Sequence, residues 1–183
     1  MPVLTPRRAR ALNVLGLYAI ALILAAAFVF QFTLRELPCP LCLLQRVAFA
    51  GLAVGPVLNL RHGPRPSHYA LSLLASLFGM LVSGRQVLLH ILPGDGGYGS
   101  AILGAHYYSW AFVGFSVAAL ASALVMLSDS QFDGRDPPRP RPLETAAVWL
   151  VVGVTLANVL NGFIECGLDV CPDNPVSYRL LGG

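Results

Sequence analysis

The segment Cys39-Pro40-Leu41-Cys42-Leu43-Leu44-Gln45-Arg46 stands where one long apolar run ends and the next begins. It combines two cysteines at CxxC spacing with an arginine four residues after the second cysteine. Proline is favoured in the first turn of a helix, so Pro38 and Pro40 indicate that a helix starts here. The segment therefore predicts a thiol pair at a membrane surface, at the start of a membrane-spanning helix.

The composition is that of an integral membrane protein. The 183 residues are 56% hydrophobic and only 11% charged, whereas about 25% are charged in a typical soluble domain. Crossing the hydrocarbon core takes roughly 20 residues. Five stretches are long enough, near residues 12–32, 42–60, 69–92, 108–128 and 144–164. The sequence predicts an all-α membrane protein, with a four-helix transmembrane bundle, a fifth C-terminal transmembrane helix and one membrane domain over residues 1–183.

The net charge of +3 is too small and too scattered to indicate a nucleic-acid partner. The first apolar run is longer than the roughly 7–15 residues of a signal peptide, so we expect it to be retained as a span.

The arginines predict the orientation. All twelve basic residues are arginines, and eight lie in the segments 1–11, 61–68 and 129–143, whereas the opposite loops hold only Arg35 and Arg179. By the positive-inside rule the N-terminus is cytoplasmic and the C-terminus lies outside. In a bacterium both cysteine pairs would then face the periplasm, where disulfides form and persist. The predicted location is the bacterial inner membrane.

Cys42 is expected in the first turn of the second span, where free N–H groups and the helix dipole favour a thiolate. Arg46 shares its helix face and lies about 6 Å deeper. Snorkelling to the interface is one interpretation of this arginine. We favour a functional one, because an arginine within a span marks function by default and a thiol lies one turn away.

The end of the third span, Gly84-Arg85-Gln86-Val87-Leu88-Leu89-His90, supplies further polar candidates. Gln86 and His90 are one turn apart on a common face. Arg85 is about 7 Å inside the outer boundary. We expect Arg85, Gln86 and His90 to gather with Cys42 and Arg46 and to bind a ligand, although a lone histidine here is more often interfacial.

Two other sets of residues have simpler expected roles. Asn158 and Asn161 in the fifth span should form interhelical hydrogen bonds. The aromatic set His106, Tyr107, Tyr108 and Trp110 is typical of an interfacial belt, and we prefer that interpretation to a ligand-binding one.

The second pair, Cys166 and Cys171, follows the last span. Gly167 gives the chain freedom to close a disulfide, and an exposed disulfide on a tail is open to thiolate attack. A purely structural disulfide and a zinc site are alternatives. Zinc is disfavoured by the loose spacing and the oxidising compartment. We therefore predict a redox relay that uses all four cysteines and no metal.

Continuous disulfide formation requires a terminal electron acceptor. The chain has no nucleotide-binding glycine fingerprint. Its four histidines (His62, His68, His90 and His106) are not placed for a buried bis-histidine haem. A lipid-soluble quinone remains, with Arg46 or His90 as donors to its carbonyl oxygens.

Cys39–Arg46 resembles the CxxC-x3-Arg signature of the DsbB family of thiol:quinone oxidoreductases, and Gly84–Pro93 resembles the end of that family's third helix. The similarity covers about residues 10–128. It implies that Cys39 and Cys42 adjoin the quinone, that Cys42 forms the thiolate–quinone contact, and that Arg46 and His90 hold the quinone. It also implies electron transfer from a periplasmic DsbA-like partner, of thioredoxin fold, to ubiquinone or menaquinone.

The chain departs from the family pattern. The family usually has four spans, with its second cysteine pair in the second outer loop. Here that loop, about 93–107, has no cysteine, and a fifth span leads to Cys166 and Cys171. Two other functions stay open: a vitamin K epoxide reductase-like enzyme running the electrons in reverse, and a non-enzymatic membrane protein with structural disulfides.

Overall fold

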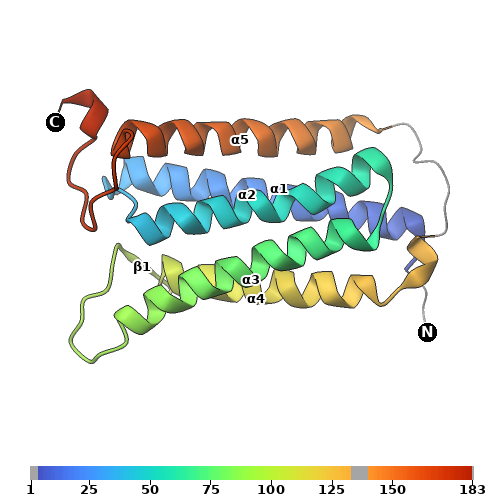
Figure 1. Cartoon of the computed structure of the whole chain (residues 1–183), viewed down its shortest axis with the longest axis horizontal. Helices are drawn as coiled ribbons and strands as arrows, with labels where there is room; N and C mark the ends of the chain where they lie inside the picture. Colours follow the sequence, from blue (N-terminus) through green and yellow to red (C-terminus); the bar gives the residue numbers. More distant parts are fainter. Residues whose placement is uncertain (1–3, 133–139, 183) are drawn as a thin grey trace.

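Five long helices make up most of the chain in the computed structural model, which describes residues 4–132 and 140–182. All five are long and apolar enough to cross a membrane. They are α1 (Pro6–Thr33), α2 (Pro40–His62), α3 (Pro66–Leu89), α4 (Tyr107–Met126) and α5 (Pro142–Cys166) (Figure 1). The predicted all-α membrane fold is confirmed. Arg135 and Arg139, which entered the orientation argument, lie outside the described residues.

Proline sets where most of these helices begin. Proline occupies the start of four helices, at Pro6, Pro40, Pro66 and Pro142. Its missing N–H is no loss there, and its fixed φ suits the first turn. Helix α3 ends at Leu89, three residues before the predicted end of its span. Pro93 disfavours helical geometry at Leu92, so the helix does not reach the predicted end at residue 92.

Helices α1 to α4 pack as antiparallel neighbours along the chain, whereas α5 runs parallel to α1, on which it packs (Figure 1). Helix α2 packs on α1 and α3, α3 packs on α4, and α5 packs on α1 with a smaller contact to α2. The backbones of α1 and α4 lie farther apart than those of the other packed pairs, and side chains such as Phe30 and Tyr107 meet between them. The buried core includes Leu17 and Leu24 of α1 and the stacked rings of Phe49 and Phe115.

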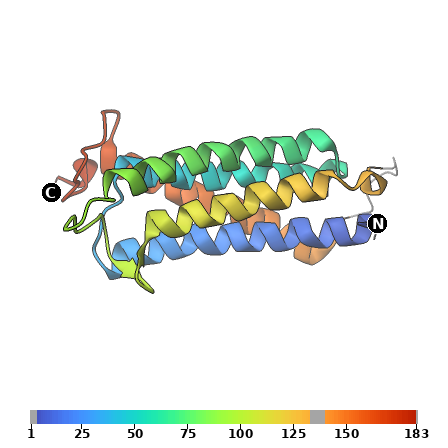
Figure 2. The ribbon, with the colours of Figure 1, turned by 90° about the horizontal axis from the view of Figure 1, so that it is seen from below.

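The two ends of the bundle differ. Helix α2 begins and α5 ends at the same end of the bundle, which we call the cysteine end (Figures 1 and 2). The loops 34–39 and 90–106 and the tail 167–182 gather there. The second of these loops contains a hairpin of β1 (Ala101–Ile102) and β2 (Ala105–His106). The N-terminus lies at the opposite end (Figure 2).

At the opposite end, buried polar side chains join the helices. Arg10 pairs with Glu144 at 2.6 Å and links α1 to α5. Asn13 donates a hydrogen bond to the Tyr69 hydroxyl at 2.9 Å, and Tyr69 donates to Gln131 at 3.0 Å. These side chains satisfy one another inside the bundle, so this end is a closed structural network.

Candidate functional site

The first cysteine pair forms the start of α2. Cys39 is the N-cap residue, Pro40 opens the helix, and Cys42 lies in its first turn, as predicted. The two cysteines are joined by a disulfide, and the Cys42 N–H donates to the Cys39 sulfur at 3.1 Å. A helix N-terminus offers unpaired N–H groups and a positive dipole end. A thiolate formed here is therefore stabilised by the backbone itself.

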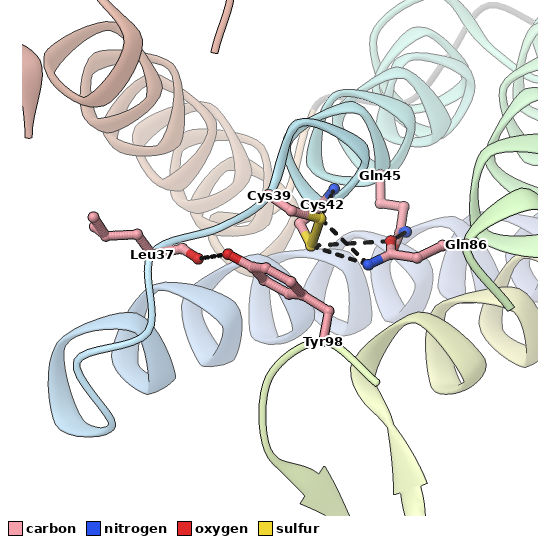
Figure 3. Close-up of a disulfide and its surroundings, with 6 residues drawn as sticks. All are labelled: Leu37, Cys39, Cys42, Gln45, Gln86 and Tyr98. Carbon is pink, nitrogen blue, oxygen red and sulfur yellow. Dashed lines mark hydrogen bonds between the residues drawn. A yellow bond between two sulfur atoms is a disulfide. The ribbon is translucent and has the colours of Figure 1, made fainter. Parts of the chain in front are cut away.

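Gln86 of α3 contacts both sulfurs (Figure 3). Its amide Nε2 lies 3.3 Å from the Cys39 sulfur and 3.5 Å from the Cys42 sulfur. Gln45 donates to the Gln86 carbonyl oxygen at 2.7 Å, so the Gln86 amide group is held with its N–H groups toward the sulfurs. Gln86 thus reaches the predicted site, but it contacts the thiol pair and does not line the cavity beside it.

A cavity of about 440 Å³ opens beside the disulfide, and Cys42 lines it while Cys39 does not. Its walls come from α1, α2, α4 and the loops of the cysteine end. Most of the lining is apolar and includes Ile23, Leu24, Phe30 and Phe49. The site therefore places one sulfur of the pair against an apolar space within the helix bundle.

Arg46 lines the same cavity. Its guanidinium donates to the Gln31 side chain at 2.9 Å, the Asn158 side chain at 3.1 Å and the Ala27 carbonyl at 3.2 Å. Within the described chain these bonds use three of its five N–H groups. The guanidinium is thus held in place, with donors left for a ligand. Asn158, and Asn161 through its bond to Gln31 at 3.1 Å, form the interhelical hydrogen bonds that the sequence predicts.

Aromatic side chains form the cavity wall on the α4 side. Tyr107, Tyr108 and Trp110 all line the cavity, and the Tyr107 ring stacks on Phe30 of α1. The Tyr107 hydroxyl is buried and has no hydrogen-bond partner among the described residues. We expected an interfacial belt at these positions, and their place in the cavity wall was missed. The available signal was that they follow the glycine-rich loop on the same side as the CxxC pair.

Tyr98 closes the cavity at the cysteine end. Its hydroxyl donates to the Leu37 carbonyl at 2.6 Å, which ties the second outer loop to the first (Figure 3). Ser100 reinforces this link, because its N–H and hydroxyl both donate to the Glu36 carboxylate. Burial, with smaller effects of Glu165 and Glu36, raises the pKa of the Tyr98 phenol, so it stays a neutral donor at neutral pH.

The two remaining predicted residues lie away from the cavity. His90 follows α3, stacks on Tyr108 and faces Asp95 at 3.1 Å. It therefore contacts a residue of the cavity lining without lining the cavity itself. Arg85 is exposed and has no hydrogen-bond or ion-pair partner within residues 4–132 and 140–182. Successive helical residues point about 100° apart, so burying Gln86 toward the sulfurs turns Arg85 outward.

Comparison with known proteins gives the site its family. The family model for "Disulfide bond formation protein DsbB" matches residues 9–99, which include Cys39, Cys42 and Arg46. Residues 9–99 are a DsbB-family segment. Proteins called "Disulfide bond formation protein B" are similar to this chain, and three examples follow.

The Xanthomonas axonopodis pv. citri (strain 306) protein is 43% identical over 91 residues, 47% of this chain and 53% of the relative. The Nitrosococcus oceani protein is 42% identical over 87 residues, 44% of this chain and 50% of the relative. The Marinobacter nauticus protein is 39% identical over 77 residues, 40% of this chain and 46% of the relative. The chain thus spans about half the length of the curated relatives it matches. No solved structure gave a significant match.

The second cysteine pair lies outside the DsbB-family segment. Cys166 ends α5, is 5% exposed and forms a disulfide with the half-buried Cys171. The tail beyond them folds back, and its Tyr178 hydroxyl accepts a hydrogen bond from Gln31 at 2.9 Å. Gln31 also bonds Arg46. The tail is therefore joined through one side chain to the residue that lines the cavity beside Cys42.

Proposed function

We propose that this chain is a membrane thiol:quinone oxidoreductase of the bacterial inner membrane, which re-oxidises a periplasmic thioredoxin-like dithiol protein of the DsbA kind. The observation that carries the proposal is that Cys42 and Arg46 line one largely apolar cavity among membrane-spanning helices. The match of residues 9–99 to the DsbB family supports it.

The cavity suits a quinone head group. Ligand pockets typically measure about 300–1,000 Å³, and this one, at about 440 Å³, falls in that range. An apolar ring with two carbonyl oxygens needs an apolar space and two hydrogen-bond donors. Within the described residues, Arg46 has unused N–H groups and the Tyr107 hydroxyl has no partner, so both would be such donors. A bound ubiquinone or menaquinone would supply an acceptor for two electrons and two protons.

The seam between α1 and α4 offers a route from the lipid to the cavity. The backbones of these helices are not closely packed, and side chains fill the space between them. Small residues of both helices line the cavity at the seam, namely Ala26, Ala27, Ala111 and Gly114. A head group carried on a lipid-soluble chain can reach the cavity here without crossing a polar surface.

In this function Cys42, Arg46 and Cys39 would each have a separate role. Cys42 faces the cavity and would act as the thiolate, held by the helix N-terminus and by the Gln86 amide. Arg46 would hold the ligand and add positive charge one turn below Cys42. Cys39, which does not line the cavity, would exchange with the second pair.

The tail pair would meet the partner. Cys171 is the more exposed cysteine, so we assign the partner's attack to Cys171 and the inward transfer to the buried Cys166. Access is one of the factors that set the rate of thiol–disulfide exchange. A DsbA-like partner is a strong oxidant near about −120 mV, so its regeneration requires an acceptor such as a quinone.

Cysteine-to-serine variants test this function. The purified chain is mixed with a reduced thioredoxin-fold dithiol oxidase and ubiquinone, and the formation of quinol and of oxidised partner is followed. We expect Cys42→Ser to abolish quinol formation. We expect Cys166→Ser and Cys171→Ser to stop partner oxidation, while Cys39–Cys42 reduced with dithiothreitol still reduces the quinone. Normal turnover in Cys42→Ser contradicts the proposal. Normal partner oxidation in both tail variants would show that the Cys166–Cys171 disulfide has only a structural role.

A further inference from the structure

Glu165 is a buried acid that the proposed function does not use. It lies in the last turn of α5, is 1% exposed, and neither carboxylate oxygen has a hydrogen-bond partner in the described chain. The C-terminal end of a helix carries the negative end of its dipole, which disfavours an anion. Buried polar groups are nearly always hydrogen-bonded, so an unpartnered carboxyl group requires an explanation.

The helix places this acid on the face that meets Arg46. Asn158, Asn161 and Glu165 follow one another at spacings of three and four residues, so they share one face of α5. All three are buried. Asn158 bonds the Arg46 guanidinium at 3.1 Å, and Asn161 bonds Gln31, which is itself an Arg46 partner.

The charged and titratable groups around Glu165 come from three elements. Arg46 of α2 is the cation that acts on its carboxylate. Glu165 contributes to the raised pKa of the Tyr98 phenol in the second outer loop. Tyr178 of the tail bonds Gln31, which is a partner of Arg46. Along the chain, Glu165 is bonded directly to Cys166. The acid therefore precedes Cys166 in the chain and lies on the face of α5 that meets the Arg46 network.

We propose that Glu165 carries a proton during the exchange between the two cysteine pairs, an inference that rests on the proposed function. The reduced tail pair has two thiols, and an attacking thiol must lose its proton to become the nucleophilic thiolate. The Glu165 carboxylate, one residue before Cys166 and buried from water, accepts that proton. Arg46 stabilises the carboxylate until then.

The exchange balances as follows. The Cys166 thiol gives its proton to Glu165, and the thiolate attacks the Cys39 sulfur. A Cys166–Cys39 bond forms while the Cys39–Cys42 bond breaks, and Cys42 leaves as a thiolate. The Cys171 thiol then closes the tail disulfide, and its proton passes to Cys39. Two electrons have moved to the first pair, and the two protons reside on the Cys39 thiol and the Glu165 carboxyl. Re-oxidation of the first pair releases the Glu165 proton.

The test uses the full chain, depleted of quinone and oxidised, to which one equivalent of the reduced thioredoxin-fold dithiol oxidase is added. Alkylation and mass mapping follow which pair is reduced over time, and infrared difference spectroscopy follows carboxyl protonation. We expect Glu165→Gln to slow the appearance of reduced Cys39–Cys42 on the order of 100-fold, a typical contribution of a positioned acid–base group. We also expect it to remove the carboxyl signal.

The pH dependence separates a proton carrier from a structural residue. Without the acid, the exchange rate should rise with pH toward the thiol's own pKa of about 8.5, because only solvent takes the proton. The wild-type rate should be flatter. Asp169→Asn is the matched control, since Asp169 is an exposed tail carboxylate paired with Arg179 at 3.2 Å. It should leave the rate, the pH profile and the infrared signal unchanged.

The outcomes separate this inference from the function beneath it. Suppose that in the wild-type protein electrons reach Cys39–Cys42, and that the Glu165→Gln variant has the same rate, pH profile and infrared spectrum as the wild type. The proton role of Glu165 is then overturned, and the relay between the cysteine pairs stands. If in the wild-type protein no electrons pass from the tail pair to Cys39–Cys42, the proton role of Glu165 and the relay are both overturned. Should Glu165→Gln not fold, Glu165→Asp replaces it. That variant must keep the carboxyl signal at a shifted frequency, and an unshifted signal assigns it to another acid.

Discussion

At the scale of single residues, Tyr107 differs most from its expected role, because it lines the cavity where the sequence predicted an interfacial belt. Its ring stacks on Phe30 across the seam between α1 and α4, and its buried hydroxyl has no partner among the described residues. In the proposed function, a quinone carbonyl oxygen would supply the hydrogen bond that this hydroxyl lacks among the described residues. We therefore expect Tyr107 to contribute to quinone binding without contributing a hydrogen bond to the stability of the free protein.

Tyr107→Phe should separate these two effects. We expect the affinity for ubiquinone to fall roughly 10-fold, the equivalent of one hydrogen bond of about 1.4 kcal/mol. The thermal stability of the ligand-free protein in detergent should not fall, since no hydrogen bond is lost. Quinone titration and thermal unfolding of the same preparation measure both quantities.

Tyr69→Phe is the matched control at the opposite end. The Tyr69 hydroxyl accepts from Asn13 and donates to Gln131, so its removal leaves buried amide groups unsatisfied. We expect a stability loss of about 1–3 kcal/mol and no change in quinone affinity. Equal effects of the two variants on affinity would remove Tyr107 from the site.

Residues in one helical turn could be predicted from the sequence, whereas residues from different helices could not. Cys42 and Arg46 lie on one face of α2 because of helical periodicity alone. Gln86 was also expected near them. Its contact with both sulfurs depends on Gln45, and the place of Tyr107 depends on how α4 lies against the cavity. Helix packing is not a local property, so no local pattern specified these contacts.

At the scale of elements, the loop between α3 and α4 acts as the cover of the site. Its Tyr98 bonds the first outer loop, and its Asp95 faces His90 and accepts the Gly97 N–H at 2.9 Å. The Gly97 N–H and the His90 side chain lower the pKa of the Asp95 carboxyl. Gly97 has φ +67°, which favours glycine at this turn. Asp95 thus orders the loop while it is ionised.

The sign of the resulting pH dependence follows from linkage. The Asp95 pKa is lower in the folded loop than in an unfolded chain, so its stabilising effect is complete above the ordinary aspartate pKa of about 3.9. The effect is lost as the pH falls through the lowered folded value. We expect the exchange protection of the Gly97 amide, corrected for intrinsic exchange, to fall below about pH 4 in wild type. Asp95→Asn should show weaker protection with no such step, and a pH-independent wild type would exclude this role for Asp95.

The helices themselves could largely be predicted, because length and apolar composition suffice to identify spans. The five predicted spans correspond to α1 through α5, and their ends differ by up to six residues, mostly where a proline opens the helix. The small hairpin at 101–106 was not foreseen. Its turn uses Leu103 and Gly104, both at positive φ, and a leucine gives no signal for that backbone geometry.

At the scale of the whole molecule, the helix bundle brings two cysteine pairs that are far apart in the sequence to the same end. The start of α2 and the end of α5 lie at the same end of the bundle (Figure 1). Gln31 bonds both the tail and Arg46, and Glu165 lies on the face of α5 that meets this network. The fifth helix thus brings a second pair to the same end as the DsbB-family pair.

The central claim is that these two pairs exchange disulfide bonds within one chain. The double variant Cys42→Ser with Cys171→Ser leaves Cys39 and Cys166 as the sole thiols. Mild oxidation at low protein concentration, followed by non-reducing mass mapping, should yield an intramolecular Cys39–Cys166 disulfide. The complementary variant, Cys39→Ser with Cys166→Ser, should form its bond far more slowly. Free thiols or only intermolecular bonds in the first variant would contradict the relay.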